Sequence, residues 1–176
     1  VLVSLFAALI AALGLIPKIM LTSGVPITAQ SLGIMLCGTV LGAKRGGAAA
    51  LLFVLLTLAG LPLLAGGRGG LGLLASPTVG FFIGFPLAAF AAGWIMERFQ
   101  RQNILVVGIL ASIVGGIIVL YIPGVLGMSA VLGKSLSDAL VLMLPFITGD
   151  LIKAALAGFI TQAIYRARPH LLLSRH

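Results

Sequence analysis

The residues with the greatest chemical potential lie near the end of the chain, in the run Thr148-Gly149-Asp150-Leu151-Ile152-Lys153. Asp150 and Lys153 are three positions apart, so they share one face of a helix. A charge at the centre of a membrane helix costs roughly 2.5–3.5 kcal/mol, whereas an i,i+3 ion pair returns only about 0.2–0.5 kcal/mol. The pattern therefore favours a pocket in which a carboxylate acceptor and an ammonium donor meet a polar ligand. The alternative is an ion pair at the outer end of the helix, with Asp150 stabilising the helix N-terminus.

The composition indicates that lipid surrounds these residues. The chain has 176 residues, of which 61% are hydrophobic and 8% are charged. Soluble domains carry roughly 25% charged residues, and so short a chain cannot hide this much apolar surface inside itself. The long charge-free stretches do not alternate with period two, as strands of a membrane barrel would. We therefore predict an all-α membrane protein.

A bilayer core needs roughly 20 apolar residues per helix, and the chain supplies six such segments within a single integral membrane domain, residues 1–176. A Gly-rich loop, 61–77, follows the third segment, and a long connection, 123–145, follows the fifth; we expect a short helical piece at 140–144. The predicted segments are residues 1–16, 27–43, 46–60, 78–96, 104–121 and 146–165.

The distribution of Lys and Arg predicts the orientation. The loops after the second and fourth segments and the C-terminal tail hold two, two and three of them, and the other loops hold one each. The positive-inside rule then places both termini in the cytoplasm of a multi-pass protein of a prokaryotic-type plasma membrane. We assign Trp94 and Tyr165 to the inner interface and Tyr121 to the outer one. Because the chain starts at Val1 rather than Met, we expect a short N-terminal piece to be missing.

Small residues recur at four-residue spacing, which lets membrane helices approach closely. This spacing predicts tight helix packing, or docking to another protein. The pairs and triplets are Ala7/Ala11, Ala8/Ala12, Gly80/Gly84, Ala89/Gly93 and Gly108/Ser112/Gly116.

Enzyme-like signals are weak. A phosphate loop ending at Lys134-Ser135 would need Gly where Met128 stands, and an intramembrane protease motif would need Gly at Ile147. The histidines lie in the tail, and Cys37 is the single cysteine, so we expect no catalytic residues, no metal site and no cofactor. The formal charge of +8 is dispersed between segments without interleaved aromatics, which argues against nucleic-acid binding.

Two of the predicted external loops have a composition suited to binding. The run 25–30 places a rigid turn beside Thr28 and Gln30, and the run 66–70 combines glycines with Arg68. Gly-rich loops often act as lids, although a simple connector is the alternative for this one.

Taken together, several of these runs resemble the BioY family, the biotin-binding S-components of energy-coupling factor (ECF) transporters. The resemblance extends over nearly the whole chain, and its motifs occur in the family order. The family pattern at the fourth segment is closer to GPTGGY, whereas this chain has Ser76, Val79 and Phe81 there. The matching runs are VPITAQ (25–30), LGAKRG (41–46), LAGLP (58–62), SPTVGF (76–81), GFP (84–86) and PFITGDLIKA (145–154).

The resemblance implies a six-helix fold with biotin near the outer face. It also implies three partners, namely a transmembrane coupling protein and two cytosolic ATPase subunits. The alanine pairs of the first segment match a docking feature of S-components, so Ala7, Ala8, Ala11 and Ala12 are the candidate docking residues.

Biotin suits the charges of the last segment, because its ureido group has two N–H donors and one carbonyl acceptor. We expect Asp150 to accept from the nitrogens and Lys153 to donate to the oxygen. The valerate carboxylate would meet loop N–H groups or Arg68; the reverse assignment, with Lys153 on the carboxylate, stays open. Phe81, Phe82 and Phe85 could pack on the bicyclic ring or serve only the core. The candidate biotin-binding residues are Asp150, Lys153, Thr28, Gln30, Arg68, Ser76, Thr78, Gly80, Phe81 and Phe85.

Three other functions remain open at this point. The chain could capture another water-soluble vitamin, it could be a stand-alone proton-coupled carrier that uses Asp150, or it could be a membrane assembly module without transport.

Overall fold

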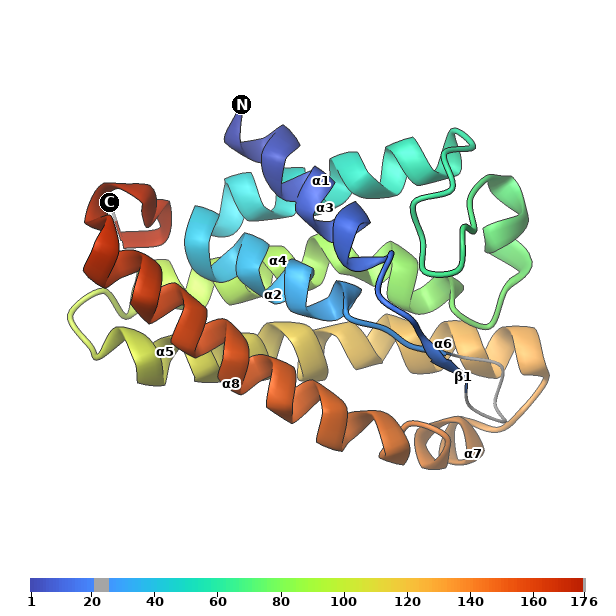
Figure 1. Ribbon diagram of the computed structural model, residues 1–176. Coiled ribbons are helices and arrows are strands. Elements are labelled where there is room, and N and C mark those ends of the chain that lie inside the picture. Colours follow the sequence, from blue (N-terminus) through green and yellow to red (C-terminus); the bar gives the residue numbers. More distant parts are fainter. Residues whose placement is uncertain (21–25, 176) are drawn as a thin grey trace.

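The computed structural model describes residues 1–20 and 26–175, and most of them are helical (Figure 1). Val25, the first residue of the run 25–30, lies outside this range. The α-helices are α1 (Leu2–Leu13), α2 (Gln30–Leu41), α3 (Ala43–Leu58), α4 (Val79–Arg98), α5 (Ile104–Ile113), α6 (Leu120–Leu132), α7 (Leu136–Val141) and α8 (Leu144–Ala167). The remaining elements are the strands β1 (Ile19–Met20) and β2 (Pro26–Ile27), the 3₁₀ turns η1 (Leu71–Ala75), η3 (Pro169–Leu171) and η4 (Leu173–Arg175), and the π-helical segment η2 (Val114–Val119).

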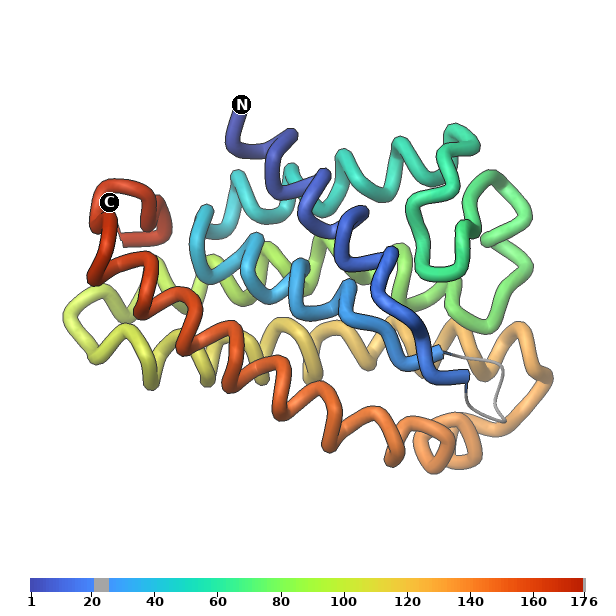
Figure 2. Tube along the Cα trace, viewed as in Figure 1, coloured from blue at the N-terminus to red at the C-terminus, as the bar shows by residue number. Residues whose placement is uncertain are grey.

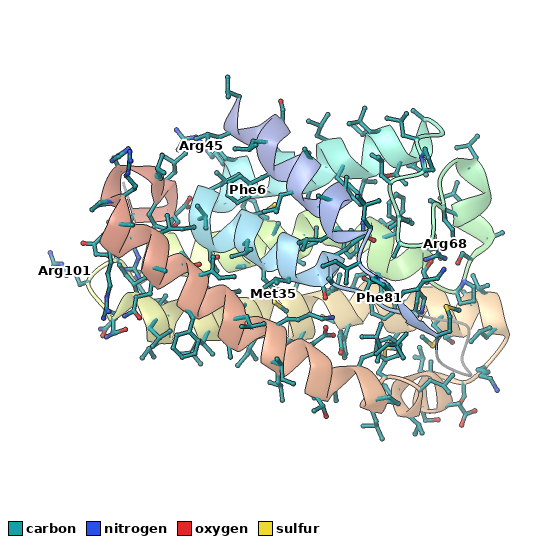
Figure 3. All side chains as sticks on the ribbon, viewed as in Figure 1. Phe6, Met35, Arg45, Arg68, Phe81 and Arg101 are labelled. Atoms are coloured by element: carbon teal, nitrogen blue, oxygen red, sulfur yellow. The ribbon has the colours of Figure 1, made fainter. Side chains whose placement is uncertain are left out.

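Helix α4 lies at the centre of the bundle. It packs against α2, α3 and α6, while α8 packs along α5 (Figure 1). The trace in Figure 2 shows the α2–α3 and α4–α5 turns at one end of the molecule, together with the C-terminus. The β hairpin, the α3–α4 loop and the α6–α7 turn lie at the opposite end. Side chains of these two ends follow the same division, with Arg45 and Arg101 at one end and Arg68 and Phe81 at the other (Figure 3).

Glycines bring the helices into close contact, as the small-residue spacing predicts. A Cβ added at Gly80 would lie 1.8 Å from the carbonyl oxygen of Pro123, and one at Gly93 would lie 2.2 Å from the carbonyl carbon of Gly42. A Cβ at Gly108 would lie 3.2 Å from the Cα of Gly158. These positions let α4 touch α6 and the α2–α3 turn, and let α5 touch α8.

The outer surface of the bundle is apolar. Within residues 1–20 and 26–175, three helical stretches are long and apolar enough to cross a membrane: α4, the continuous run 104–132, and α8. Large side chains such as Leu87 on α4, Leu110 on α5 and Phe159 on α8 are each more than half exposed. In water this exposure would be costly, so these faces are suited to contact with lipid.

The first and second helices are shorter than we expected. Both α1 and α2 contain 12 residues. Ile27, the first residue of the predicted second segment, pairs with β1 instead of extending α2. Gly42 then ends α2 with a φ of +85°, a conformation that glycine adopts without a steric penalty. The small β hairpin was not predicted from the sequence.

The predicted break after Tyr121 is wrong. Helix continues through η2 and α6 to Leu132, with Pro123 inside α6. Proline removes only one backbone N–H, whereas ending the helix inside an apolar layer would leave several backbone groups without partners. The short helix in the connection is α7, which begins at Leu136 rather than at Leu140.

The C-terminal tail folds back onto the bundle. Leu172 is fully buried, and the hydroxyl of Ser174 donates to the carbonyl oxygen of Thr39. The guanidinium of Arg175 donates to the carbonyl oxygens of Phe99 and Gln100 in the α4–α5 turn. Burial lowers the pKa of this guanidinium. The tail thus closes the end of the bundle opposite Arg68.

Candidate solute-binding site

A pocket lies at the end of the bundle that carries the β hairpin and the α3–α4 loop. Most of its wall is apolar, with polar groups at a few points. The lining residues are Pro26, Ile27, Thr28, Gln30, Ser31, Leu64, Arg68, Thr78, Phe81, Phe82, Phe85, Leu120, Phe146, Asp150 and Lys153.

Asp150 and Lys153 meet inside this pocket, as the i,i+3 spacing predicts. The Nζ atom of Lys153 lies 2.9 Å from Oδ1 of Asp150, and their side chains are 15% and 8% exposed. Both residues line the pocket, so the pair is not an isolated ion pair at the outer end of the helix. Its polar atoms are available to a guest molecule.

Two residues from other helices complete the charge cluster. The hydroxyl of Ser31, on α2, accepts from Lys153 Nζ at 2.9 Å and donates to Asp150 Oδ1 at 3.3 Å. The hydroxyl of Tyr121, on α6, donates to Asp150 Oδ2 at 2.7 Å. We assigned Tyr121 to the outer membrane interface from its place in the sequence, and this stays a prediction; its hydroxyl points at the carboxylate of Asp150.

The hydrogen-bond inventory of the cluster leaves room for a ligand. An ammonium has three N–H donors, and Lys153 uses two of them within the described part of the chain. A carboxylate has about four lone-pair sites, and Asp150 accepts three bonds from described residues. One N–H of Lys153 and one lone pair of Asp150 thus have no partner among the described residues, which suits a neutral group that both donates and accepts.

Gln30 holds the α3–α4 loop beside this cluster. Its amide nitrogen donates to the carbonyl oxygens of Ile10 at 3.1 Å and Leu63 at 3.0 Å, and its amide oxygen accepts from the backbone N–H of Ala65 at 3.0 Å. The side chain is 1% exposed. Although Gln30 lines the pocket, these bonds tie α1, α2 and the loop together.

Arg68 reaches the pocket from the loop that Gln30 holds. Its Nε donates to the carbonyl oxygen of Ala65 at 3.3 Å, and a short bridge pairs Arg68 with Leu64. Partial burial lowers the pKa of the guanidinium, but an arginine side chain stays protonated in proteins. Its remaining N–H groups can form the two-pronged contact that carboxylates favour.

Aromatic rings form the apolar part of the wall. Phe81 lies edge-on to Tyr121, with ring centroids 6.0 Å apart, and stacks on Phe146 at 6.5 Å. Phe82 and Phe85 pack instead on Phe53 in the central core, at 6.5 and 6.2 Å. Phe81 is half-buried, whereas Phe82 and Phe85 are nearly fully buried.

Most of the candidate residues come together in the pocket. Ser76 and Gly80 are not among the lining residues. The Ser76 hydroxyl is 2.9 Å from that of Thr78, and Gly80 contacts the backbone of Pro123. The lining residues that the sequence analysis did not single out as site residues are Pro26, Ile27, Ser31, Leu64, Leu120 and Phe146. The one sequence feature that could have pointed to Ser31 is its position as a polar residue directly after Gln30.

The two alanine pairs of α1 point in different directions. Ala7 is buried in the core, Ala11 is partly buried, and Ala8 and Ala12 are exposed. A partner could reach only the face that carries the second pair.

A helical bundle with a lipid-suited surface and a pocket at one end, holding a shielded pair of opposite charges, defines a membrane protein that binds a small polar solute. Residues 1–170 match the BioY family, and the chain belongs to that family.

Relatives and a solved structure agree with this assignment. The chain is 47% identical to a biotin transporter BioY of Rhodobacter capsulatus over 99% of this chain and 96% of the relative. It is 48% identical to a biotin transporter BioY of Rhizobium etli over 96% of this chain and 94% of the relative. The crystal structure of the S-component for biotin from an ECF-type ABC transporter superposes with a TM-score of 0.88, at 30% identity, over 94% of this chain and 89% of that one.

Proposed function

We propose that this protein is the biotin-specific capture component of an ATP-driven vitamin importer of the ECF type. The observation that carries the proposal is the pair of Asp150 and Lys153 at a shielded pocket wall, with one donor and one acceptor that no described residue uses. A cyclic urea presents both functions in one neutral group. The BioY relatives and the solved S-component carry biotin in their descriptions.

In the proposed complex the ureido group meets the charge cluster. Asp150 accepts from a ureido nitrogen, and Lys153 donates to the ureido oxygen. The valerate carboxylate extends to Arg68, whose cationic fork matches it, while Phe81 and Phe146 cover the bicyclic ring. Thr28 and Thr78 supply hydroxyl groups at the pocket wall.

Release into the cell requires partners in this proposal. A transmembrane coupling protein and two cytosolic ATPase subunits reorient the chain, which docks through the exposed Ala8/Ala12 face of α1 in a six-span arrangement with cytoplasmic termini. The support is the family membership and the structural likeness to an S-component. Biotin accumulation in liposomes that contain only this chain and a pH gradient would contradict this part.

Biotin binding by the purified protein tests the capture step. We expect saturable binding, and Asp150→Asn should weaken it at least tenfold, which corresponds to about 1.4 kcal/mol. The amide can no longer accept the same set of bonds and no longer balances Lys153. Isothermal titration calorimetry gives both dissociation constants.

Asp138→Asn is the matched control, because Asp138 lies exposed at the start of α7, where it accepts from Ser135. It should bind biotin like the wild type. If Asp150→Asn binds as tightly as this control, the proposed pocket is not the biotin site.

A further inference from the structure

Tyr121 lies behind the pocket wall rather than in it. It is the second residue of α6, next to Leu120, which does line the pocket. The ring is half-buried and packs edge-on against Phe81, and Tyr121 is not among the lining residues. A ligand in the pocket would therefore contact Phe81 and Asp150, and the effect of Tyr121 would pass through them.

The hydroxyl of Tyr121 holds one specific oxygen of the carboxylate. Oδ1 of Asp150 takes the bonds from Lys153 and Ser31, while the bond to Oδ2, 2.7 Å long, comes from Tyr121. An ionised carboxylate only accepts hydrogen bonds, so the tyrosine must be the donor. Such charge-assisted bonds are roughly twice as strong as neutral ones.

Because the two carboxylate oxygens have different partners, the arrangement determines which polar atoms of the ion pair stay available to a ligand. Without the tyrosine bond, Oδ2 has no partner among the described residues, and the carboxylate is free to rotate toward the ammonium of Lys153. A carboxylate turned in this way would engage the N–H groups of Lys153 that a ligand carbonyl needs. Holding Oδ2 away from Lys153 keeps both the free acceptor and the free donor in place before the ligand arrives, which lowers the ordering cost of binding.

We propose that Tyr121 is a positioning residue of the biotin site, which fixes the orientation of Asp150 through its hydroxyl and thereby keeps Lys153 free for the ligand. The inference rests on the proposed function, because it takes biotin as the ligand of this pocket.

Tyr121→Phe removes the hydroxyl and keeps the ring that packs on Phe81. We expect the dissociation constant for biotin to rise about tenfold in the wild-type background. In the Asp150→Asn background the same substitution should change it less than twofold, because the group through which the hydroxyl acts is already altered. Calorimetric titration of the four proteins completes this double-mutant cycle, which isolates the coupling.

Each outcome of the cycle decides one point. Wild-type affinity in Tyr121→Phe, or an equal loss in both backgrounds, would overturn the positioning role and leave the proposed function intact, provided that Asp150→Asn weakens binding. If Asp150→Asn itself binds normally, the proposed site and the positioning role both fail. Tyr165→Phe is the control, since Tyr165 is exposed near the end of α8 and is not among the residues that line the pocket, and it should bind like the wild type.

A spectroscopic measurement tests the contact without ligand and without losing the hydroxyl. The chain has two tyrosines, so Tyr165→Phe leaves Tyr121 as the single one. The tyrosine doublet in ultraviolet resonance Raman spectra should show a strong hydrogen-bond donor in this variant. Addition of Asp150→Asn should shift the doublet toward a weak donor; an unchanged doublet would overturn the proposed contact.

Discussion

At the scale of single residues, Gln30 shows how a polar side chain at a pocket can be structural. The sequence run 25–30 indicated a binding role for it. Its amide group satisfies three backbone groups, one of Ile10 in α1 and two of Leu63 and Ala65 in the α3–α4 loop, and its binding role stays a prediction. Burial of those groups without a partner would cost about 1–3 kcal/mol each.

Gln30→Leu should therefore lower both stability and affinity. We expect a loss of roughly 2–5 kcal/mol in the free energy of unfolding, because the backbone groups of Leu63 and Ala65 lose their partner, while the carbonyl oxygen of Ile10 keeps the N–H of Gly14. Biotin affinity should fall as well, since the loop that carries Arg68 is no longer held. Thermal unfolding in detergent and biotin titration measure the two effects.

The control for this substitution is Gln162→Leu on α8, a partly buried position without a described side-chain bond, which should change neither quantity much. Unchanged stability in Gln30→Leu would show that the three bonds contribute little.

At the scale of secondary-structure elements, the contact between α4 and α6 aligns two parts of the site. Phe81 comes from α4 and Tyr121 from α6, and the backbone of Gly80 touches that of Pro123 between them. The helix that contains Pro123 runs unbroken from Ile104 to Leu132, so a change at this contact would move a long element rather than a loop.

Gly80→Ala should push α4 and α6 apart. The added Cβ would lie 1.8 Å from the Pro123 carbonyl oxygen, and backbone atoms cannot yield as a flexible side chain can. Such overpacking costs typically 1–3 kcal/mol. We expect a lower melting temperature and weaker biotin binding, measured on the purified protein.

Gly72→Ala is the matched control, because a Cβ there meets nothing within 4 Å. If Gly80→Ala has the same melting temperature as this control, α4 and α6 can separate there without a loss of stability, and the close approach does not constrain the site.

At the scale of the whole molecule, the fold separates two chemically different ends. Arg45 and Arg101 lie at the end closed by the C-terminal tail, and Arg68 lies at the end with the pocket (Figure 3). The positive-inside rule predicts that the first end faces the cytoplasm. On this prediction the pocket faces the outside.

Labelling of single cysteines tests this orientation. The sole cysteine, Cys37, is fully buried and serves as a silent background. A membrane-impermeant maleimide applied to intact cells should label Lys134→Cys, at an exposed position beside the pocket end, and should spare Arg101→Cys until the cells are permeabilised. The opposite pattern would invert the orientation, and labelling of both in intact cells would contradict a spanning arrangement.

Two conclusions could be drawn from the sequence alone: the chain is a helical membrane protein, and Asp150 and Lys153 share one helix face. Both conclusions depend on local quantities: the length of apolar segments, and a spacing that helix geometry converts directly into a contact. The resemblance to BioY, which the comparisons confirm as family membership, came from short runs of the same local kind.

The groups that surround that pair could be identified only from the folded structure. Ser31 and Tyr121 lie 119 and 29 positions from Asp150, and the bonds of Gln30 join segments 20 to 35 positions away. The break expected at Pro123 was wrong for a related reason. Whether a helix can end at a given residue depends on whether its surroundings offer partners for the backbone groups that the end exposes. Contacts between helices depend on how their surfaces interlock and in which register, and neither is encoded in the spacing of residues along one segment.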